Sequence, residues 1–491
     1  MKNITEQQIM SLAPNAAAAS NGKKISNSGG FVKLYKSADD TFFMGECKGS
    51  GKNPYITSAD YVDPAKPVFR CSCPSRQFPC KHSLGLMYEM MKDKTFEPCE
   101  IPEDIVRKRG KIAAKNAPEK SPEELTPEEA AKLAKKKASA AKTAKKAKSA
   151  KLEKQLEGLE LCEKAVKELV SAGLGTMGGT SLSTYQNLSK QLGDYYLVGP
   201  QRLVNKLIFE ISVSQVSNAE AHYDKAIDIL EKLYTLIKKS RDYINKKLES
   251  DDVSNDDTVL YEELGGAWKI TELEAIGKCE KNARMAQLSF WVDYDESRKE
   301  YTDTGVWLDL NTAQVYLTKN YRPLKSLKYL KADDTVFGAM NVPSMVIYPG
   351  EGNVRVRWEA AEFSELTEDD FAKIRNAAVK SINADAKEIK NLLKNAIQSP
   401  ILFKLVEFKQ IGKIGESFVL KQSGGDTLTL LDCPELVETT VGKLSILPNA
   451  SLLENGVMLC GFWYDAASRA ICAMPMAIVP NDEDTILRLL Y

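Results

Sequence analysis

Residues 71–82 read CSCPSRQFPCKH, which places three cysteines and one histidine within twelve positions. A structural Zn²⁺ ion takes four sulfur or nitrogen ligands in a tetrahedron. The thiolates of Cys71, Cys73 and Cys80 and the imidazole of His82 supply that set. Two prolines in the intervening loop reduce the chain entropy that is lost when the ligands converge. The stretch therefore predicts one structural zinc ion per chain, held by these four residues.

Two other interpretations of the cluster remain open. Free cysteine is commonly a core residue, so the thiols could simply be buried beside a surface histidine. A redox centre is the second alternative, although Cys-Xaa-Cys lacks the Cys-Xaa-Xaa-Cys spacing of thioredoxin-like sites. The hydrophilic, proline-containing context favours a metal site. A catalytic zinc would need an open coordination position and a nearby acid or base, and no such element accompanies the four ligands.

The sequence around this stretch predicts a small domain of strands and one helix. Aromatic and β-branched runs, separated by turn signals, predict antiparallel strands over residues 31–35, 41–48, 55–60 and 68–70. Apolar residues at helical spacing predict a helix over residues 81–92. We expect a ββα-type zinc-finger domain over residues 30–100, preceded by a flexible N-terminus at residues 1–29.

A strongly basic segment follows the predicted finger. Residues 107–154 hold sixteen Lys or Arg against six Asp or Glu, or about +10, although the net charge of the whole chain is zero. Thr126 and Pro127 form a favourable helix start, and an apolar stripe begins at Leu152. We expect a charged, Lys/Ala-rich helical linker over residues 101–151, whose helix continues from residue 126 to residue 172.

Beyond the linker, the hydrophobic period is helical at first and mostly strand-like later. Residues 203–211 and 219–248 predict helices that form a bundle with the end of the linker helix, which gives a helical domain over residues 152–282. Residues 283–491 are predicted as a β-rich domain with one inserted helix at residues 366–397. The expected fold class is multidomain α+β.

The composition is that of a folded protein that does not span a membrane. Hydrophobic residues make up 43% of the chain, charged residues 27%, and the mean hydropathy is −0.31. No apolar run approaches the ~18 residues that span a bilayer, and the first twenty residues lack the apolar core of a secretory signal. We expect a cytoplasmic protein with no membrane partner, whose ten cysteines are thiols.

Few residues are available for catalysis. His82 and His222 are the only histidines; the first is assigned to the metal, and the second is expected on the solvated side of a helix. The GSGKN segment at residues 49–53 fails the phosphate-loop pattern, because Asn53 replaces the required Ser or Thr. We predict no catalytic residues, no cofactor besides zinc and no small-molecule substrate, and hence a protein that is not an enzyme.

The Cys-Xaa-Cys pair, the short spacer and the Cys-Xaa-His pair resemble the SWIM zinc finger. On that resemblance Cys71, Cys73, Cys80 and His82 occupy the four ligand positions, and the six-residue spacer lies at the short end of the family's range. The match covers residues 55–92, and the layout of the rest is similar to bacterial SWIM zinc finger family proteins. The resemblance implies a zinc-binding protein whose finger contacts DNA or other proteins. Such proteins are often encoded beside MoxR-type AAA ATPases and von Willebrand factor A domain proteins.

The sequence leaves two classes of partner. We favour a protein partner, with the finger as a recognition module and an assembly with the two neighbours just named. The alternative is DNA, with Arg70, Arg76, Lys81 and the linker lysines on its phosphates. A net charge of zero gives no global attraction to a polyanion, and lysines without interleaved aromatic residues suit only sequence-independent contacts. The linker lysines are Lys132, Lys135, Lys136, Lys137, Lys142, Lys145, Lys146, Lys148, Lys151 and Lys154.

Overall fold

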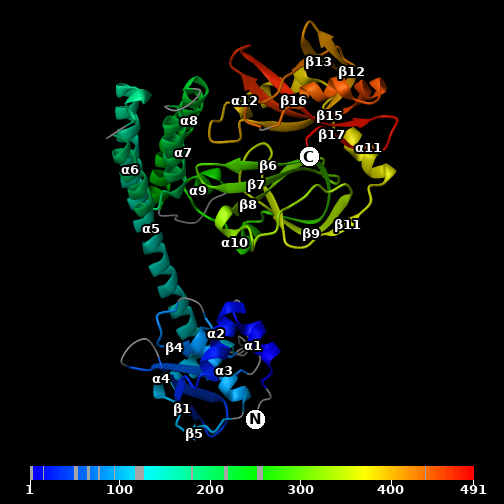
Figure 1. Ribbon diagram of the computed structural model, residues 1–491. Helices are drawn as coiled ribbons and strands as arrows, with labels where there is room; N and C mark the ends of the chain where they lie inside the picture. The colour runs from blue at the N-terminus through cyan, green and yellow to red at the C-terminus, as the bar shows by residue number, and fades with distance from the viewer. Residues whose placement is uncertain are drawn as a thin grey trace. The chain divides into compact units, whose positions relative to one another are not determined.

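A computed structural model of the chain shows mixed helix and sheet in two compact units, residues 1–135 and 136–491 (Figure 1). Among the residues described, no helix is both long and apolar enough to cross a membrane. The structure describes residues 4–14, 16–48, 53–63, 67–75, 78–92, 94–116, 127–178, 181–214, 219–250, 258–436 and 438–490.

The first unit contains a five-stranded sheet with the order β4-β3-β2-β1-β5. Its first four strands form an antiparallel meander, and the short β5 runs parallel to β1. In the β1–β2 turn, the hydroxyls of Ser37 and Thr41 donate to Asp39, and Asp40 has a φ of 52°. The four strands predicted before residue 71 are present. The strands are β1 (Phe31–Lys36), β2 (Phe42–Cys47), β3 (Tyr55–Asp60), β4 (Val68–Cys71) and β5 (Glu97–Pro98).

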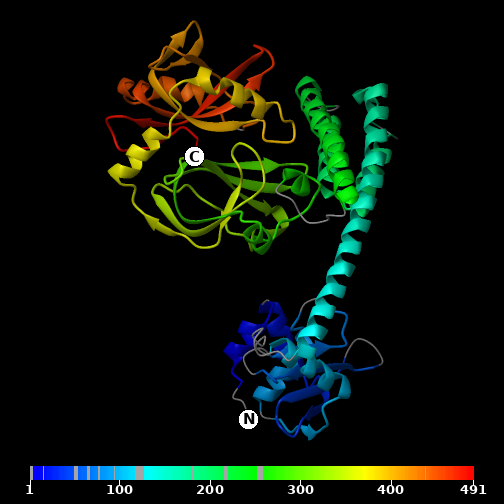
Figure 2. The same ribbon diagram turned by 180° about the vertical axis from the view of Figure 1, so that it is seen from behind.

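Helix α3 (Lys81–Met91), which was also predicted, is buried along most of its length. Figure 2 shows the helices and strands of the first unit from the opposite side. Leu86 packs towards the sheet with Ala59, and Leu84 packs with Ile9 of the N-terminal helices. Helix α2 (Ala16–Asn27) approaches α3 closely because Gly22 lacks a side chain: a Cβ there would lie 2.9 Å from Leu84 Cβ. The helix is therefore enclosed by the sheet and by α2.

We expected a flexible N-terminus at residues 1–29, but the described part of this segment forms helices that pack on α3. Helix α1 (Glu6–Leu12) begins with a capping box in which Thr5 Oγ1 accepts from Gln8 N–H and Gln8 Oε1 accepts from Thr5 N–H. Ile9 is fully buried against α3. The physical reason for the difference is that α3 has apolar residues on two sides, and the sheet covers only one of them.

The segment expected as a single linker, residues 101–151, contains two different helices. Helix α4 (Glu103–Asn116) is attached to the first unit, because Arg109 donates to Asp60 and Thr41. Helix α5 (Pro127–Ala172) matches the predicted linker helix, and residues 142–148 on it are exposed. The predicted N-cap, Thr126, lies outside the described residues.

Four helices of the second unit share one apolar core that includes Leu159, Leu192, Leu233 and Ile237. Glu163 of α5 pairs with Arg241 and Lys167, and the first of these pairs ties α5 to α8. Helix α6 was not predicted from the sequence. The other three helices are α6 (Leu182–Asp194), α7 (Val198–Ser214) and α8 (Ala219–Ser250).

The first C-terminal sheet has the order β10-β9-β6-β7-β8, with β11 also paired to β9. A bridge between Leu317 and Arg355 brings β8 next to β10, so the sheet curls towards closure. Short helices α9 (Val259–Glu263) and α10 (Ile270–Ala275) precede it. The strands are β6 (Cys279–Asp295), β7 (Glu300–Asp309), β8 (Val315–Pro323), β9 (Ala339–Ile347), β10 (Val356–Trp358) and β11 (Glu362–Ser364).

The second C-terminal sheet has the order β14-β13-β12-β15-β16-β17, and an additional β14–β16 pairing closes it into a barrel. One core between the two C-terminal sheets includes Leu288, Leu308, Leu405 and Leu459, so the sheets pack on each other (Figure 1). Each sheet has a second core on its other side. The strands are β12 (Leu402–Ile414), β13 (Ser417–Lys421), β14 (Thr427–Leu430), β15 (Glu454–Asp465), β16 (Ala470–Pro480) and β17 (Leu487–Arg488).

The prediction of a single helix over residues 366–397 is wrong, because the structure has two helices there, α11 (Glu368–Asn376) and α12 (Ile382–Leu393). Between them Val379 N–H donates to Leu405 O at 2.8 Å, and Glu407 N–H donates to Val379 O at 3.0 Å. This bridge to β12 takes the backbone out of the helix, and Ser381 then caps α12.

Candidate metal centre

The four predicted ligands lie on the connection between β4 and α3. Cys71 is the last residue of β4, where it pairs with Thr57 of β3, and Cys73 follows in the turn. Cys80 is the N-cap of α3, and its side chain makes no capping hydrogen bond, so its sulfur is free to point away from the helix end. His82 lies in the first turn of α3. The strand end and the helix start therefore present all four side chains to the same space.

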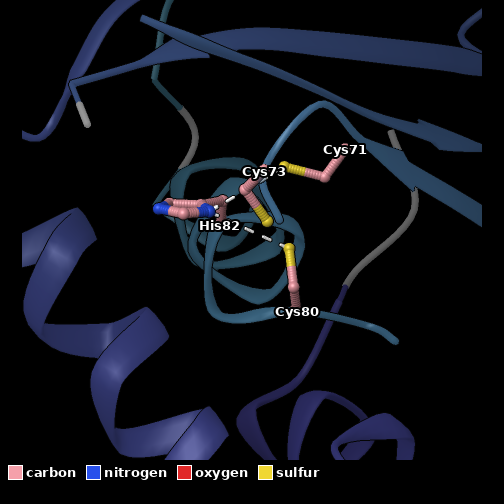
Figure 3. Close-up of side chains that lie close together, drawn as sticks. All are labelled: Cys71, Cys73, Cys80 and His82. Carbon is pink, nitrogen blue, oxygen red and sulfur yellow. Dashed lines mark hydrogen bonds between the residues drawn. The ribbon is translucent and has the colours of Figure 1, made fainter. Parts of the chain in front are cut away.

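Figure 3 shows three sulfur atoms and one imidazole nitrogen converging on a common centre. Their ligand atoms all lie within 4.8 Å of one another. His82 Nδ1 is 3.8 Å from Cys71 Sγ and 3.9 Å from Cys80 Sγ. Zinc–sulfur bonds of about 2.3 Å and zinc–nitrogen bonds of about 2.0 Å imply tetrahedral edges of roughly 3.5–3.8 Å. The donor set and its spacing fit a zinc ion.

Polar and aromatic neighbours hold the site from outside. The Tyr55 ring lies against His82, with 4.9 Å between ring centroids. Ser83 Oγ is 3.5 Å from Cys80 Sγ and 3.1 Å from Thr57 Oγ1, and the Thr57 hydroxyl donates to Arg70 O at 3.1 Å. These contacts connect β3, β4 and α3 around the ligands, which restricts the movement of the side chains that would bind the ion.

The hydrogen bond between Cys71 and Cys80 shifts the pKa values of these two thiols in opposite directions, and burial raises the pKa of the neighbouring Cys47. The hydrogen bond with Cys71 lowers the pKa of Cys80, helped by His82 and Ser83 and opposed by burial. The same hydrogen bond, together with burial, raises the pKa of Cys71. Burial, reinforced by the charge of Cys80, raises the pKa of Cys47 to about 11. Cys47 lies outside the four-donor group, so it is a buried protonated thiol beside the site.

A buried carboxylate next to the site was missed in the sequence. Asp60 is fully buried at the end of β3, and it accepts hydrogen bonds from Arg70 at 3.3 Å and from Arg109 at 2.8 and 3.0 Å. Arg70 directly precedes the ligand Cys71. The sequence contained one signal for this contact. Asp60 is an acid at the end of a predicted strand, and the next predicted strand, which pairs with it, carries Arg70.

The basic residues predicted to contact phosphates differ in their surroundings. Arg70 is paired with Asp60, whose single negative charge is shared between Arg70 and Arg109. Lys81 is exposed, and Arg76 lies outside the described residues. On α5 the side chains of Lys142, Lys145, Lys146, Lys148 and Lys154 are exposed, while those of Lys132, Lys135, Lys136 and Lys137 fall outside the described part of the chain.

The remaining histidine has a partner. His222 Nδ1 is 2.7 Å from Glu210 Oε2, and the pair joins α7 to α8. The expectation that His222 lies on the solvated side of its helix is therefore wrong: the side chain is largely buried against α7. The phosphate-loop-like residues 49–52 lie outside the described residues.

A closed set of three thiols and one imidazole at the start of a helix belongs to the class of structural zinc sites, in which all four positions are filled by protein. Residues 70–90, which include all four donors, match the family model of the SWIM zinc finger. The match covers this short segment of the chain. Comparison with curated proteins gives no match.

Proposed function

We propose that this chain is a zinc-binding interaction protein that is not an enzyme, with one structural zinc held by Cys71, Cys73, Cys80 and His82. The convergence of these four side chains carries the proposal. When bound, the ion supplies a fixed cross-link between the end of β4 and the start of α3. The chain's own residues do the rest: Tyr55 and Ser83 orient the ligands, and burial of His82 limits the access of water.

Metal analysis tests the zinc site. The purified full-length chain should contain about one equivalent of zinc, because four ligands of the preferred types are already gathered. The Cys73→Ser, Cys80→Ser double variant should lose it. The matched control is Cys47→Ser, since Cys47 is a neighbouring thiol outside the donor group. Stoichiometric metal in the double variant would refute the assignment.

The surface beside the site supports a protein partner. Ile56 and Phe78 are exposed by 53% and 48%, and both lie next to the ligand loop. Ile56 is bonded through its backbone to Ser72, between two ligands, and Phe78 lies two residues before Cys80. Exposed apolar groups beside the ligand loop favour a protein surface over phosphates. On the family resemblance, a MoxR-type ATPase and a von Willebrand factor A domain protein are the first candidates.

Duplex DNA is the second candidate, and the exposed lysines of α5 favour it. Phosphate contacts lose affinity steeply with salt, by a log–log slope of about 0.9 per contact. A finger-centred protein interface should depend less on salt, because its core is apolar.

The discriminating experiment is a pull-down from native lysate with and without nuclease. It compares wild type, the single variant Phe78→Ser, and a variant in which Lys142, Lys145, Lys146 and Lys148 become Glu. If the proposal holds, proteins co-purify after nuclease treatment, and Phe78→Ser loses them while the lysine variant keeps them. If nuclease removes all of them and only the lysine variant fails to shift duplex DNA, DNA replaces protein as the target.

A screen of the same preparations for enzymatic turnover tests the proposal that the chain is not an enzyme. An activity that is abolished by a point variant outside the finger would contradict this proposal.

A further inference from the structure

A second surface lies in the other unit of the chain. Residues 324–332, here named the Leu-Lys segment, connect β8 towards β9 and read LKSLKYLKA, three triplets that each begin with Leu-Lys. The segment starts as a 3₁₀-helix at Leu324–Ser326 and continues through hydrogen-bonded turns. The triplet spacing matches the three residues per turn of a 3₁₀-helix, in which residues three apart eclipse one another.

The Leu-Lys segment exposes apolar side chains that folded proteins usually cover. Tyr329 is 76% exposed, Leu324 42% and Leu330 39%, and the neighbouring Tyr321 on β8 is 40% exposed. A contiguous apolar group with polar residues around it is typical of an interaction site. The exposed leucines and tyrosines therefore need an explanation beyond the folding of β8.

The Leu-Lys segment also carries an excess of positive charge. Lys325, Lys328 and Lys331 are exposed, and none of them forms an ion pair within the part of the chain that the structure describes. The segment itself contains no acid before Asp333. Three lysines beside exposed apolar side chains complement a partner that offers carboxylates beside apolar groups.

The segment is held in one conformation from both ends. Leu324 N–H donates to Lys299 O at 3.0 Å, and Asn320 Nδ2 donates to Lys331 O at 3.0 Å. Asp333 N–H donates at 2.9 Å to Asp303, a fully buried carboxylate that also binds Arg322. Because the backbone is already ordered, binding here loses little chain entropy.

We propose that the Leu-Lys segment is a docking surface for an acidic, amphipathic segment of another protein. Nucleic acid fits less well, because the Lys328 amine lies over the Tyr329 ring, 5.0 Å from its centroid, and leucines cannot stack on bases. A membrane surface fits less well, because helices that lie on a membrane bury a long apolar face, whereas this segment has nine residues and begins with a single 3₁₀ turn. The surface is independent of the zinc finger.

Fluorescence anisotropy on the full-length chain tests this proposal. The probe is a labelled synthetic peptide of repeated Glu-Leu-Ala triplets. We expect saturable binding that weakens at least roughly tenfold when Lys325, Lys328 and Lys331 become Glu, and also when Leu324 and Leu330 become Ser. The matched control changes Lys409, Lys413 and Lys421, exposed lysines on β12 and β13, to Glu, and should bind as wild type.

Oligothymidylate and phosphatidylserine vesicles, presented in the same assay, separate the partner classes. Binding to either of these that is tighter than peptide binding, and is lost in the same lysine variant, would overturn the proposal in favour of that class. Absence of peptide binding by wild type would also overturn it. If the charge-reversal variant does not fold, as judged by tryptophan fluorescence, the three lysines are changed to Gln instead, and the same loss is expected.

Discussion

The N-terminal sheet and the two C-terminal sheets are both largely antiparallel, yet they are stabilised in different ways. The N-terminal sheet has partly buried strands, and its small cores centre on α3. In the C-terminal sheets the central strands are buried on both faces, and long apolar stretches of β15 and β16 have no exposed residue. The comparison teaches that two sheets packed on each other rely on burial, whereas the small sheet has little apolar area and would gain most from the metal cross-link proposed above.

Removal of zinc should give the largest difference between the N-terminal sheet, which should lose its structure, and the C-terminal sheets, which should keep theirs. A chelator should abolish hydrogen-exchange protection in β3, β4 and α3, because structural zinc contributes on the order of 10 kcal/mol to the folding of small zinc-dependent domains. Tryptophan fluorescence should not change, since all five tryptophans lie at or beyond Trp268. Retained protection in α3 after complete zinc removal would show that apolar packing alone holds the N-terminal sheet.

The second prediction weakens the core of the second C-terminal sheet and leaves the zinc ligands unchanged. Phe408 is 1% exposed in the barrel core, so Phe408→Ala should lower the free energy of unfolding of this region by about 3–5 kcal/mol. Urea unfolding followed by tryptophan fluorescence measures the loss. Zinc content should stay as in wild type; a reduced zinc content would mean that the two regions do not fold independently.

A smaller effect is expected at the attachment of α4. Arg109→Met leaves Arg70 as the remaining charged partner of the buried Asp60, and should cost about 2–3 kcal/mol in the first unit. Hydrogen exchange of α4 and β3 measures this. The control is Lys108→Met, because the Lys108–Asp104 pair is exposed and should contribute no more than about 0.5 kcal/mol. Equal effects of the two variants would contradict the role assigned to Asp60.

The smallest effect concerns pH. The Arg284 guanidinium holds the pKa of the buried Asp370 at about 2, below its ordinary value near 4. A lowered carboxyl pKa stabilises the fold above about pH 4, and this contribution of roughly 2 kcal/mol is lost as the pH falls towards about 2. Urea unfolding at several acidic pH values should show a shallower decline for Asp370→Asn than for wild type. Parallel declines would exclude the pair as a source of acid sensitivity.

Local patterns made part of this structure predictable. The metal ligands are adjacent in the chain, so their convergence follows from the spacing of Cys71 to His82 alone. The strands before them and α3 were found because turn residues and apolar periodicity agree locally. The pairing of Asp60 with Arg109 could not be predicted, because the two residues are 49 positions apart and only the folded sheet brings them together.

The C-terminal region shows where sequence patterns fail. Strands β9 to β11 were not expected, because β9 pairs with the distant β6, and the short strands β10 and β11 in turn pair with β9. The break between α11 and α12 depends on Val379 reaching β12, which no local signal shows. Cys460 of β15 and Cys472 of β16 lie on opposite faces of the second sheet, in different cores, which the sequence alone does not show.

The short span of the ligand set has a consequence for biosynthesis. All four ligands, and the helices and strands around them, belong to residues 1–135, which leave the ribosome before the rest of the chain exists. At roughly 5–20 residues per second, translation of the remaining residues lasts about 20–70 s. The four proposed zinc ligands can therefore come together, and the N-terminal fold can form, while the two C-terminal sheets are still being made.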